Sequence, residues 1–199
     1  MKKFELTNEF ITNMFGTKLF RIRALVEFGN VEAGELGGYV EKESNLGHDD
    51  NAWVYDNAWV YGDAQVSGDA LVYDNAWVYG NAQVSGNARV YGDARVCGNA
   101  LVYGDAWVCG DARVCGNGDY AYAHGFGSVN RTTTFFRLKD GGVGVRCGCF
   151  YGTLAQFRDK IRETHGETKK AQEYLMLADL MELRFEEDEN EVGNRKYVE

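Results

Sequence analysis

The chain of 199 residues lacks proline altogether, has only three histidines and contains no long apolar run. No stretch approaches the roughly 18 to 20 apolar residues that a membrane-spanning helix needs. Glu5, Asn8 and Glu9 interrupt any signal-peptide core at the start of the sequence. We therefore expect a cytoplasmic protein that has no membrane partner.

Positive charge is also scarce, because the 21 lysines and arginines are outnumbered by 30 aspartates and glutamates, which gives a net charge of -9. This balance disfavours the phosphate backbone of a nucleic acid as the main partner. The five cysteines are an odd number, and only Cys147 and Cys149 form a closely spaced pair. The sequence thus predicts free thiols, with no disulfide framework, no zinc site and no other cofactor.

What the sequence has in abundance is one pattern, repeated as eleven consecutive hexads over residues 51–116. Every hexad begins with Asn or Asp, has Ala in second and Val in fourth place, and ends with Gly or Asp. Ala and Val are two residues apart, so both point to the same side of an extended strand. We predict a short strand in each hexad with these side chains inward, corners that suit Gly and Asn, and Asn side chains stacked at the corners.

A second, longer period groups the hexads in threes. NAWVYG at residue 57 returns at residue 75, and DAQVSG at residue 63 returns as NAQVSG at residue 81. Three hexads then make one coil, which gives about 3.7 coils stacked about 4.8 Å apart. The pattern resembles the left-handed parallel β-helix of hexapeptide-repeat proteins, a triangular prism whose handedness is implied by the resemblance alone. The predicted fold is mainly β.

The two ends of such a stack expose unpaired strand edges and need capping segments. We expect residues 1–50 to form an N-terminal β cap with a strand near residues 18–26. Residues 51–128 are assigned to the solenoid, residues 129–188 to a small C-terminal ββαα module, and residues 189–199 to a polar tail.

The ββαα module is predicted from turn and helix signals. The tetrad Lys139-Asp140-Gly141-Gly142 between two apolar segments is typical of a tight hairpin. Thr153-Leu154-Ala155-Gln156 is a capping box at the start of a helix that Gly166 ends. A second helix is expected from about Thr168 to Phe185.

The run RIRALVEFGNVEAGELGGYVEKESNL, followed by the hexads, resembles the YdcK-like bacterial β-solenoid family over roughly residues 1–116. That family is grouped with hexapeptide-repeat transferases by fold, and it supplies no catalytic residues to carry over. The ββαα module is similar to tails of phage and prophage solenoid proteins. This likeness implies a host-interaction or anti-defence role, in which the chain blocks a host protein or sequesters a nucleotide signal between subunits.

Stacking each hexad on the third one after it assigns the outward side chains to three faces, two of them aromatic toward the N-terminal end and one polar. The predicted binding surface consists of Trp53, Tyr55, Trp59, Tyr61, Tyr73, Trp77, Tyr79, Arg95, Trp107 and Arg113. Trp, Tyr and Arg dominate binding hot spots, and monomers seldom expose so much aromatic surface. Something is therefore expected to cover it.

Three kinds of cover are open at this point. The first is self-association into a trimer or dimer, trimers being what the hexapeptide resemblance implies, or the chain's own C-terminal module packing back. The second is a foreign protein surface, and the third is a sugar or nucleotide base stacked on the rings. We expect a non-enzymatic binding protein, homo-oligomeric or attached to another macromolecule.

The alternative is an acyltransferase that uses acyl-coenzyme A, which is the habitual activity of hexapeptide prisms. Such a reaction needs a base, most often histidine. His48, His124 and His165 all lie outside the regular hexads, so we predict surface histidines and no catalytic residue. Cys97 and Cys115 hold the same place in two hexads that are three apart, so they are expected to be stacked neighbours with free thiols.

Overall fold

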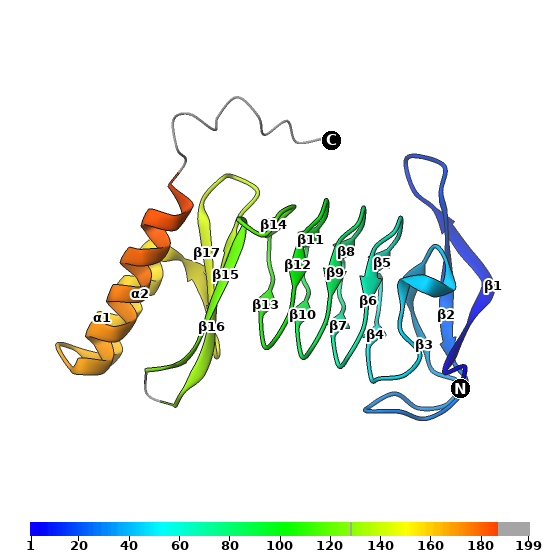
Figure 1. Cartoon of the computed structure of the whole chain (residues 1–199), viewed down its shortest axis with the longest axis horizontal. Helices are drawn as coiled ribbons and strands as arrows, with labels where there is room; N and C mark the ends of the chain where they lie inside the picture. The colour runs from blue at the N-terminus through cyan, green and yellow to red at the C-terminus, as the bar shows by residue number, and fades with distance from the viewer. Residues whose placement is uncertain (128, 187–199) are drawn as a thin grey trace.

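The structure is a computed structural model that describes residues 1–127 and 129–186. A central β-solenoid lies between an N-terminal group of strands and a C-terminal sheet that carries two helices (Figure 1). Each hexad forms one two-residue strand. These strands are β4 (Trp53–Val54), β5 (Trp59–Val60), β6 (Gln65–Val66), β7 (Leu71–Val72), β8 (Trp77–Val78), β9 (Gln83–Val84), β10 (Arg89–Val90), β11 (Arg95–Val96), β12 (Leu101–Val102), β13 (Trp107–Val108) and β14 (Arg113–Val114).

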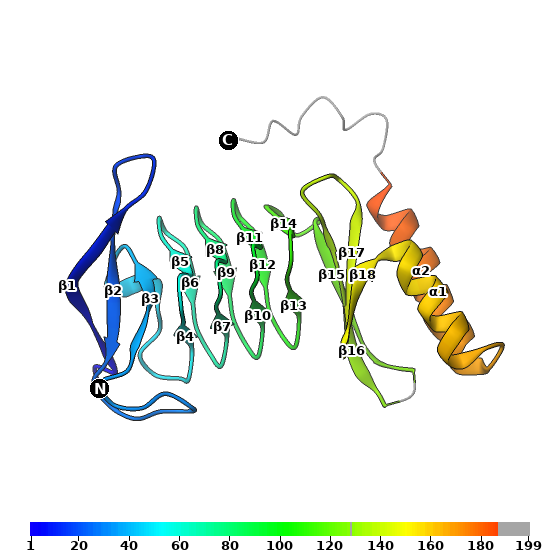
Figure 2. The ribbon, with the colours of Figure 1, turned by 180° about the vertical axis from the view of Figure 1, so that it is seen from behind.

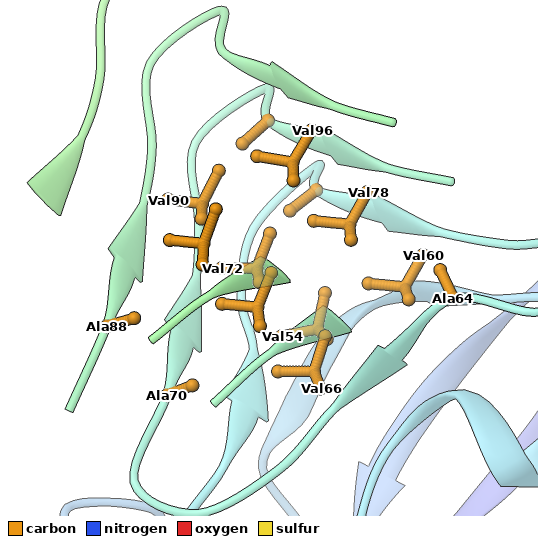
Figure 3. Packing of buried hydrophobic residues seen from close by; sticks show 14 of the residues in the cluster. Val54, Val60, Ala64, Val66, Ala70, Val72, Val78, Ala88, Val90 and Val96 are labelled. Carbon is orange, nitrogen blue, oxygen red and sulfur yellow. The ribbon is translucent and has the colours of Figure 1, made fainter. Parts of the chain in front are cut away.

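The strands stack into three parallel sheets, one on each side of the prism, in the orders β4-β7-β10-β13, β5-β8-β11-β14 and β6-β9-β12. Val54 pairs with Val72 and Val72 pairs with Val90, so the three valines lie on top of one another (Figure 3). This register confirms the period of three hexads per coil and the predicted assignment of side chains to faces.

The interior of the solenoid is filled by the second and fourth residues of the hexads. All eleven alanines and all eleven valines at these positions are fully buried. Ten of the eleven corners end in Gly or Asp with positive φ, between 52° at Asp56 and 72° at Gly80. The prediction of inward Ala and Val and of Gly-containing corners is thus confirmed.

The N-terminal cap contains two strands more than the one predicted. Strand β1 (Phe4–Thr12) pairs antiparallel with β2 (Lys18–Ala24), which pairs antiparallel with β3 (Leu36–Val40), and η1 (Glu43–Asn45) follows. Strand β3 then pairs in parallel with β5, with Val40 against Val60. Leu46 forms a bridge to Val66 in the same way, so the solenoid register begins before the first regular hexad.

The C-terminal region is a four-stranded antiparallel sheet followed by two helices. Its elements are β15 (Tyr120–Phe126), β16 (Arg131–Arg137), β17 (Val143–Cys147), β18 (Phe150–Thr153), α1 (Leu154–His165) and α2 (Lys169–Phe185). The predicted hairpin is β16–β17, and the Thr153 capping box opens α1 as expected. Strands β15 and β18 widen the predicted hairpin on both sides. The domain boundaries stay predictions, and the polar tail lies outside the described residues.

The C-terminal sheet covers the end of the solenoid, and the two helices pack on its far side (Figure 2). The backbone N–H of Trp107 donates to Oγ1 of Thr134 at 3.0 Å, and Ala112 forms a bridge to Leu138. Strand β16 separates two cores, because Phe136 joins the solenoid cluster whereas Phe135 joins the cluster beneath the helices. In the part of the chain that the structure describes, no helix has the length and hydropathy needed to cross a membrane.

Candidate binding surfaces of the solenoid

The sheet β5-β8-β11-β14 presents a row that we call the Trp–Arg face, formed by Trp59, Trp77, Arg95 and Arg113. The Trp59 and Trp77 rings stack with centroids 4.5 Å apart and planes 5° apart. The Arg95 guanidinium lies 4.3 Å from the Trp77 ring centroid. Because β8 lies between β5 and β11, Trp77 is covered on both ring faces and turns a ring edge outward.

The Trp–Arg face is rich in hydrogen-bond donors. Indole and guanidinium groups can only donate. Arg113 donates from Nη1 to the backbone oxygens of Asp93, at 2.9 Å, and Ala112, at 2.8 Å. Burial and the neighbouring charge of Arg95 lower the Arg113 pKa. Among the described residues, neither Arg95 nor Arg113 forms an ion pair with a carboxylate.

Beside the Trp–Arg face runs a second row, which begins with Tyr61 and Tyr79. Their rings stack with centroids 5.1 Å apart, and burial raises the Tyr61 pKa to about 12, so this hydroxyl stays protonated near neutral pH. The row continues with Cys97 and Cys115, which the structure joins in a disulfide. The prediction of free thiols is therefore wrong for this pair, because in-register stacking brings their Cα atoms to 4.3 Å. Cys109 and Cys147 are free and buried, and Cys149 is free and exposed.

Trp53 does not belong to any exposed surface, although the sequence analysis places it there. Its side chain is 0% exposed. The Phe28 ring packs edge-on against it with centroids 5.3 Å apart, and Phe4 does so at 6.2 Å. Neighbouring Tyr55 is half-buried and packs against the same cluster. The N-terminal cap thus covers the first rung of this face, a contact that the hexad pattern cannot reveal.

The remaining rungs of that face carry a tyrosine stack and one tryptophan. Tyr73 and Tyr91 stack with centroids 4.8 Å apart and planes 3° apart. Trp107 is half-buried between two guanidinium groups, with Arg89 5.0 Å and Arg146 5.2 Å from its ring centroid. Sequence reasoning missed Arg146, because it lies in β17 and no repeat relates it to Trp107.

The three histidines occupy three separate places. His48 Nδ1 accepts from the backbone N–H of Lys3 at 3.2 Å, and the His48 ring stacks on Phe4. His124 lies in β15, with Nδ1 2.9 Å from Oγ1 of Thr132. His165 is the last residue of α1, and its ring stacks on Tyr174 of α2. The described part of the chain shows no group of three or more His, Cys, Asp or Glu arranged to hold a metal ion.

The sequence model of the YdcK β-solenoid repeat matches residues 64–80, 82–96 and 94–110. These matches lie inside the solenoid and cover less than half of the chain. No curated protein matches the sequence.

Proposed function

We propose that this YdcK-like β-solenoid protein is a non-enzymatic binding protein whose Trp–Arg face holds a carboxylate-rich surface of a partner protein. The observation that carries the proposal is the in-register row of Trp59, Trp77, Arg95 and Arg113, which offers donors and no side-chain acceptor. Stacking fixes these side chains before binding, so little rotamer freedom is lost when a partner docks.

Electrostatics favour an acidic partner. Arg95 and Arg113 are in-register neighbours, and like charges directly opposite each other are destabilising. A carboxylate placed between them relieves this repulsion and forms strong charge-assisted hydrogen bonds. Aromatic ring edges carry partial positive charge, so the outward edges of Trp59 and Trp77 suit the same kind of partner.

The same geometry disfavours one occupant that the sequence leaves open, a stacked sugar or base. A base or sugar needs an open ring face, whereas Trp59 and Arg95 cover the two faces of Trp77. A nucleic-acid backbone needs many basic contacts along its length, whereas this face offers two arginines in a chain with a net charge of -9.

The kind of partner is proposed from the sequence resemblances. The likeness of the C-terminal module to prophage solenoid tails supports a host protein as the partner, in a host-interaction or anti-defence role. Self-association into a dimer or trimer through the Trp–Arg face is the competing arrangement. The proposal gives the three histidines no catalytic role, and it assigns no acyl-coenzyme A chemistry to the solenoid.

The test is a titration of the full chain with a fluorescein-labelled, glutamate-rich peptide, followed by fluorescence anisotropy. We expect the double variant Trp59→Ala/Trp77→Ala and the double variant Arg95→Gln/Arg113→Gln each to bind at least about tenfold more weakly than the wild type. The matched control is Gln65→Ala/Gln83→Ala, which changes two exposed residues at the same hexad position on another face. The control should bind like the wild type.

Light scattering on the same samples measures native mass and distinguishes the two possible occupants of the Trp–Arg face, a partner protein and a second copy of this chain. A monomeric wild type whose peptide binding depends on the Trp–Arg face supports an acidic partner protein. A wild-type dimer or trimer that Trp59→Ala/Trp77→Ala converts to monomer assigns the face to self-association instead. Equal peptide affinity of the face variants and the control contradicts the proposal.

A further inference from the structure

A pocket of about 410 Å³ lies where the last coils of the solenoid meet the C-terminal sheet. The solenoid contributes Arg89 from β10, Trp107 from β13 and Asp105 from the corner before β13. The C-terminal sheet contributes Arg131 from β16 and Arg146 from β17. The pocket is separate from the Trp–Arg face, which belongs to a different sheet of the prism.

The pocket is positively charged within an acidic protein. Three guanidinium groups line it against the single carboxylate of Asp105. Asp105 is itself engaged, because Nδ2 of Asn87 donates to its Oδ1 at 2.9 Å. Among the described residues, none of the three arginines forms an ion pair with a carboxylate. No carboxylate of the described residues therefore lies close enough to these guanidinium groups to pair with them.

Contacts with neighbouring groups hold Arg89 and Arg146 in place. Arg89 and Arg146 lie on the Trp107 ring, and Arg146 also donates from Nη1 to the backbone oxygen of Cys149 at 3.3 Å. The Arg146 Nε is buried and has no hydrogen-bond partner in the described part of the chain. An unsatisfied buried donor of this kind is costly, and Arg146 lines the pocket despite this cost.

Arg131 is positioned by the turn between β17 and β18. Its guanidinium occupies the space that a Cβ at Gly148 would fill. Gly148 has a φ of +57°, a conformation that favours glycine, so the turn itself leaves room for the arginine. The turn at Cys147-Gly148-Cys149 thus provides the space in which the Arg131 guanidinium lies.

From this arrangement we propose that the pocket binds a phosphate-bearing small molecule. Planar guanidinium groups match phosphate oxygens with paired, charge-assisted hydrogen bonds, and the three arginines come from three strands around one cavity. The volume is within the usual range for small-molecule sites. Recognition rests on the phosphate and not on base stacking, because two guanidinium groups already occupy the Trp107 ring.

Isothermal titration calorimetry of the full chain with pyrophosphate, and separately with ATP, tests this inference. We expect both probes to bind, and Arg131→Gln and Arg146→Gln each to weaken binding at least about tenfold. Arg162→Gln is the matched control, since Arg162 is an exposed arginine on α1 outside the pocket, and it should leave binding unchanged. The affinity should also fall as salt is raised.

The milder variants Arg131→Lys and Arg146→Lys keep the charge and guard against loss of folding, which circular dichroism checks. They should bind more weakly than the wild type, because lysine cannot form the paired contacts. The inference is overturned if neither pyrophosphate nor ATP binds at millimolar concentration. It is also overturned if the wild type and the glutamine variants bind equally well. A single-stranded oligonucleotide is titrated as a third probe, and binding of the oligonucleotide alone also overturns the inference. None of these outcomes bears on the acidic-peptide titration, which depends on residues of the Trp–Arg face.

Discussion

At the scale of single residues, the solenoid depends on side chains small enough for its interior and on corners that accept positive φ. Every rung supplies only Ala and Val inward, and none of the eleven phenylalanines of the chain lies within residues 51–116. Corners stack as tightly as strands do. A Cβ at Gly86, where φ is +67°, would lie 2.9 Å from the backbone nitrogen of Gly104 in the next rung.

We predict that Gly86→Ala lowers the free energy of unfolding by about 2 kcal/mol, because alanine is strained at positive φ and its Cβ presses on the next coil. Urea denaturation followed by circular dichroism measures the loss. Gly118→Ala is the control, since no heavy atom lies within 4 Å of its Cβ position and its φ is not in the positive region. The control should change stability by less than about 0.5 kcal/mol. Equal stabilities of the two variants would argue against tight corner stacking.

Lys3 is a buried cation at the N-terminal end, with only 3% of its surface exposed. Its Nζ donates to the backbone oxygens of Asp50, at 2.6 Å, and Ala52, at 2.8 Å, and it lies over the Phe28 ring. Burial lowers its pKa from 10.5 to about 8, although the nearby Asp50 carboxylate opposes the shift. The folded chain therefore gives up this proton more readily than the unfolded chain.

The lowered pKa of Lys3 makes the stability of the folded chain depend on pH. Below pH 8 Lys3 is protonated in both the folded and the unfolded chain, and the folded chain bears the full free-energy cost of burying the charge. Between pH 8 and 10.5 the folded chain loses the proton first, so this cost falls and the free energy of unfolding rises. The slope for one proton is at most about 1.4 kcal/mol per pH unit. Above pH 10 the raised pKa of Tyr61 acts in the opposite direction. Urea denaturation between pH 7.5 and 9.5 should show the rise in the wild type and lose it in Lys3→Met; the same slope in both would refute this assignment.

At the scale of elements, a strand of two residues has no stability of its own and exists only through its neighbours in the stack. Backbone bonds run from each rung to the next, as from Trp77 N–H to Ala94 O at 2.9 Å. Corner side chains add a parallel ladder, in which Asn51 Nδ2 donates to Asp69 Oδ1 at 2.7 Å and Asn81 Nδ2 to Asn99 Oδ1 at 3.0 Å. The predicted Asn stacking is thus confirmed, with Asp as its partner at several corners.

Asn51→Asp should destabilise the first corner of this ladder by about 0.5 to 1 kcal/mol at neutral pH, because the substitution removes the donor and sets two carboxylates in adjacent rungs. The loss should shrink near pH 4, where one of the two carboxyl groups takes up a proton. Asn57→Asp is the matched control, because its in-register neighbour is Asn75. Thermal unfolding at both pH values measures the difference, and an equal effect of the two substitutions would contradict the ladder.

Elements with a local signal were predictable and the others were not. Hexads repeat, and the capping box at Thr153 lies within one helical turn, so the strands β4–β14 and the start of α1 follow from short windows of sequence. Strands β1, β3, β15 and β18 have no repeat. Their strand conformation depends on the strands they pair with, which the sequence alone does not identify. Strand β3 pairs with β5, and β15 pairs with β16.

At the scale of the whole molecule, the two ends decide which parts of the repeated faces stay open. The N-terminal cap brings Phe28 onto Trp53, and the C-terminal sheet brings Arg146 onto Trp107. Both contacts join segments that no periodicity relates, so the repeat pattern predicts an exposed Trp53 and gives no sign of the arginine pocket. The Trp–Arg face lies between the two ends and follows from the repeat, and strand β3 of the cap only extends its register with Tyr39 against Trp59.

The four tryptophans provide the most direct measurement, because each indole N–H gives its own signal in a proton–nitrogen correlation spectrum. Single Trp→Phe variants assign the signals, and the glutamate-rich peptide is then added to the full chain. We expect the Trp59 and Trp77 indole signals to shift, while those of Trp53 under its phenylalanines and Trp107 between its arginines stay in place. Shifts confined to Trp107, or none at all on Trp59 and Trp77, would contradict the claim that the stacked row between the two caps is the binding face.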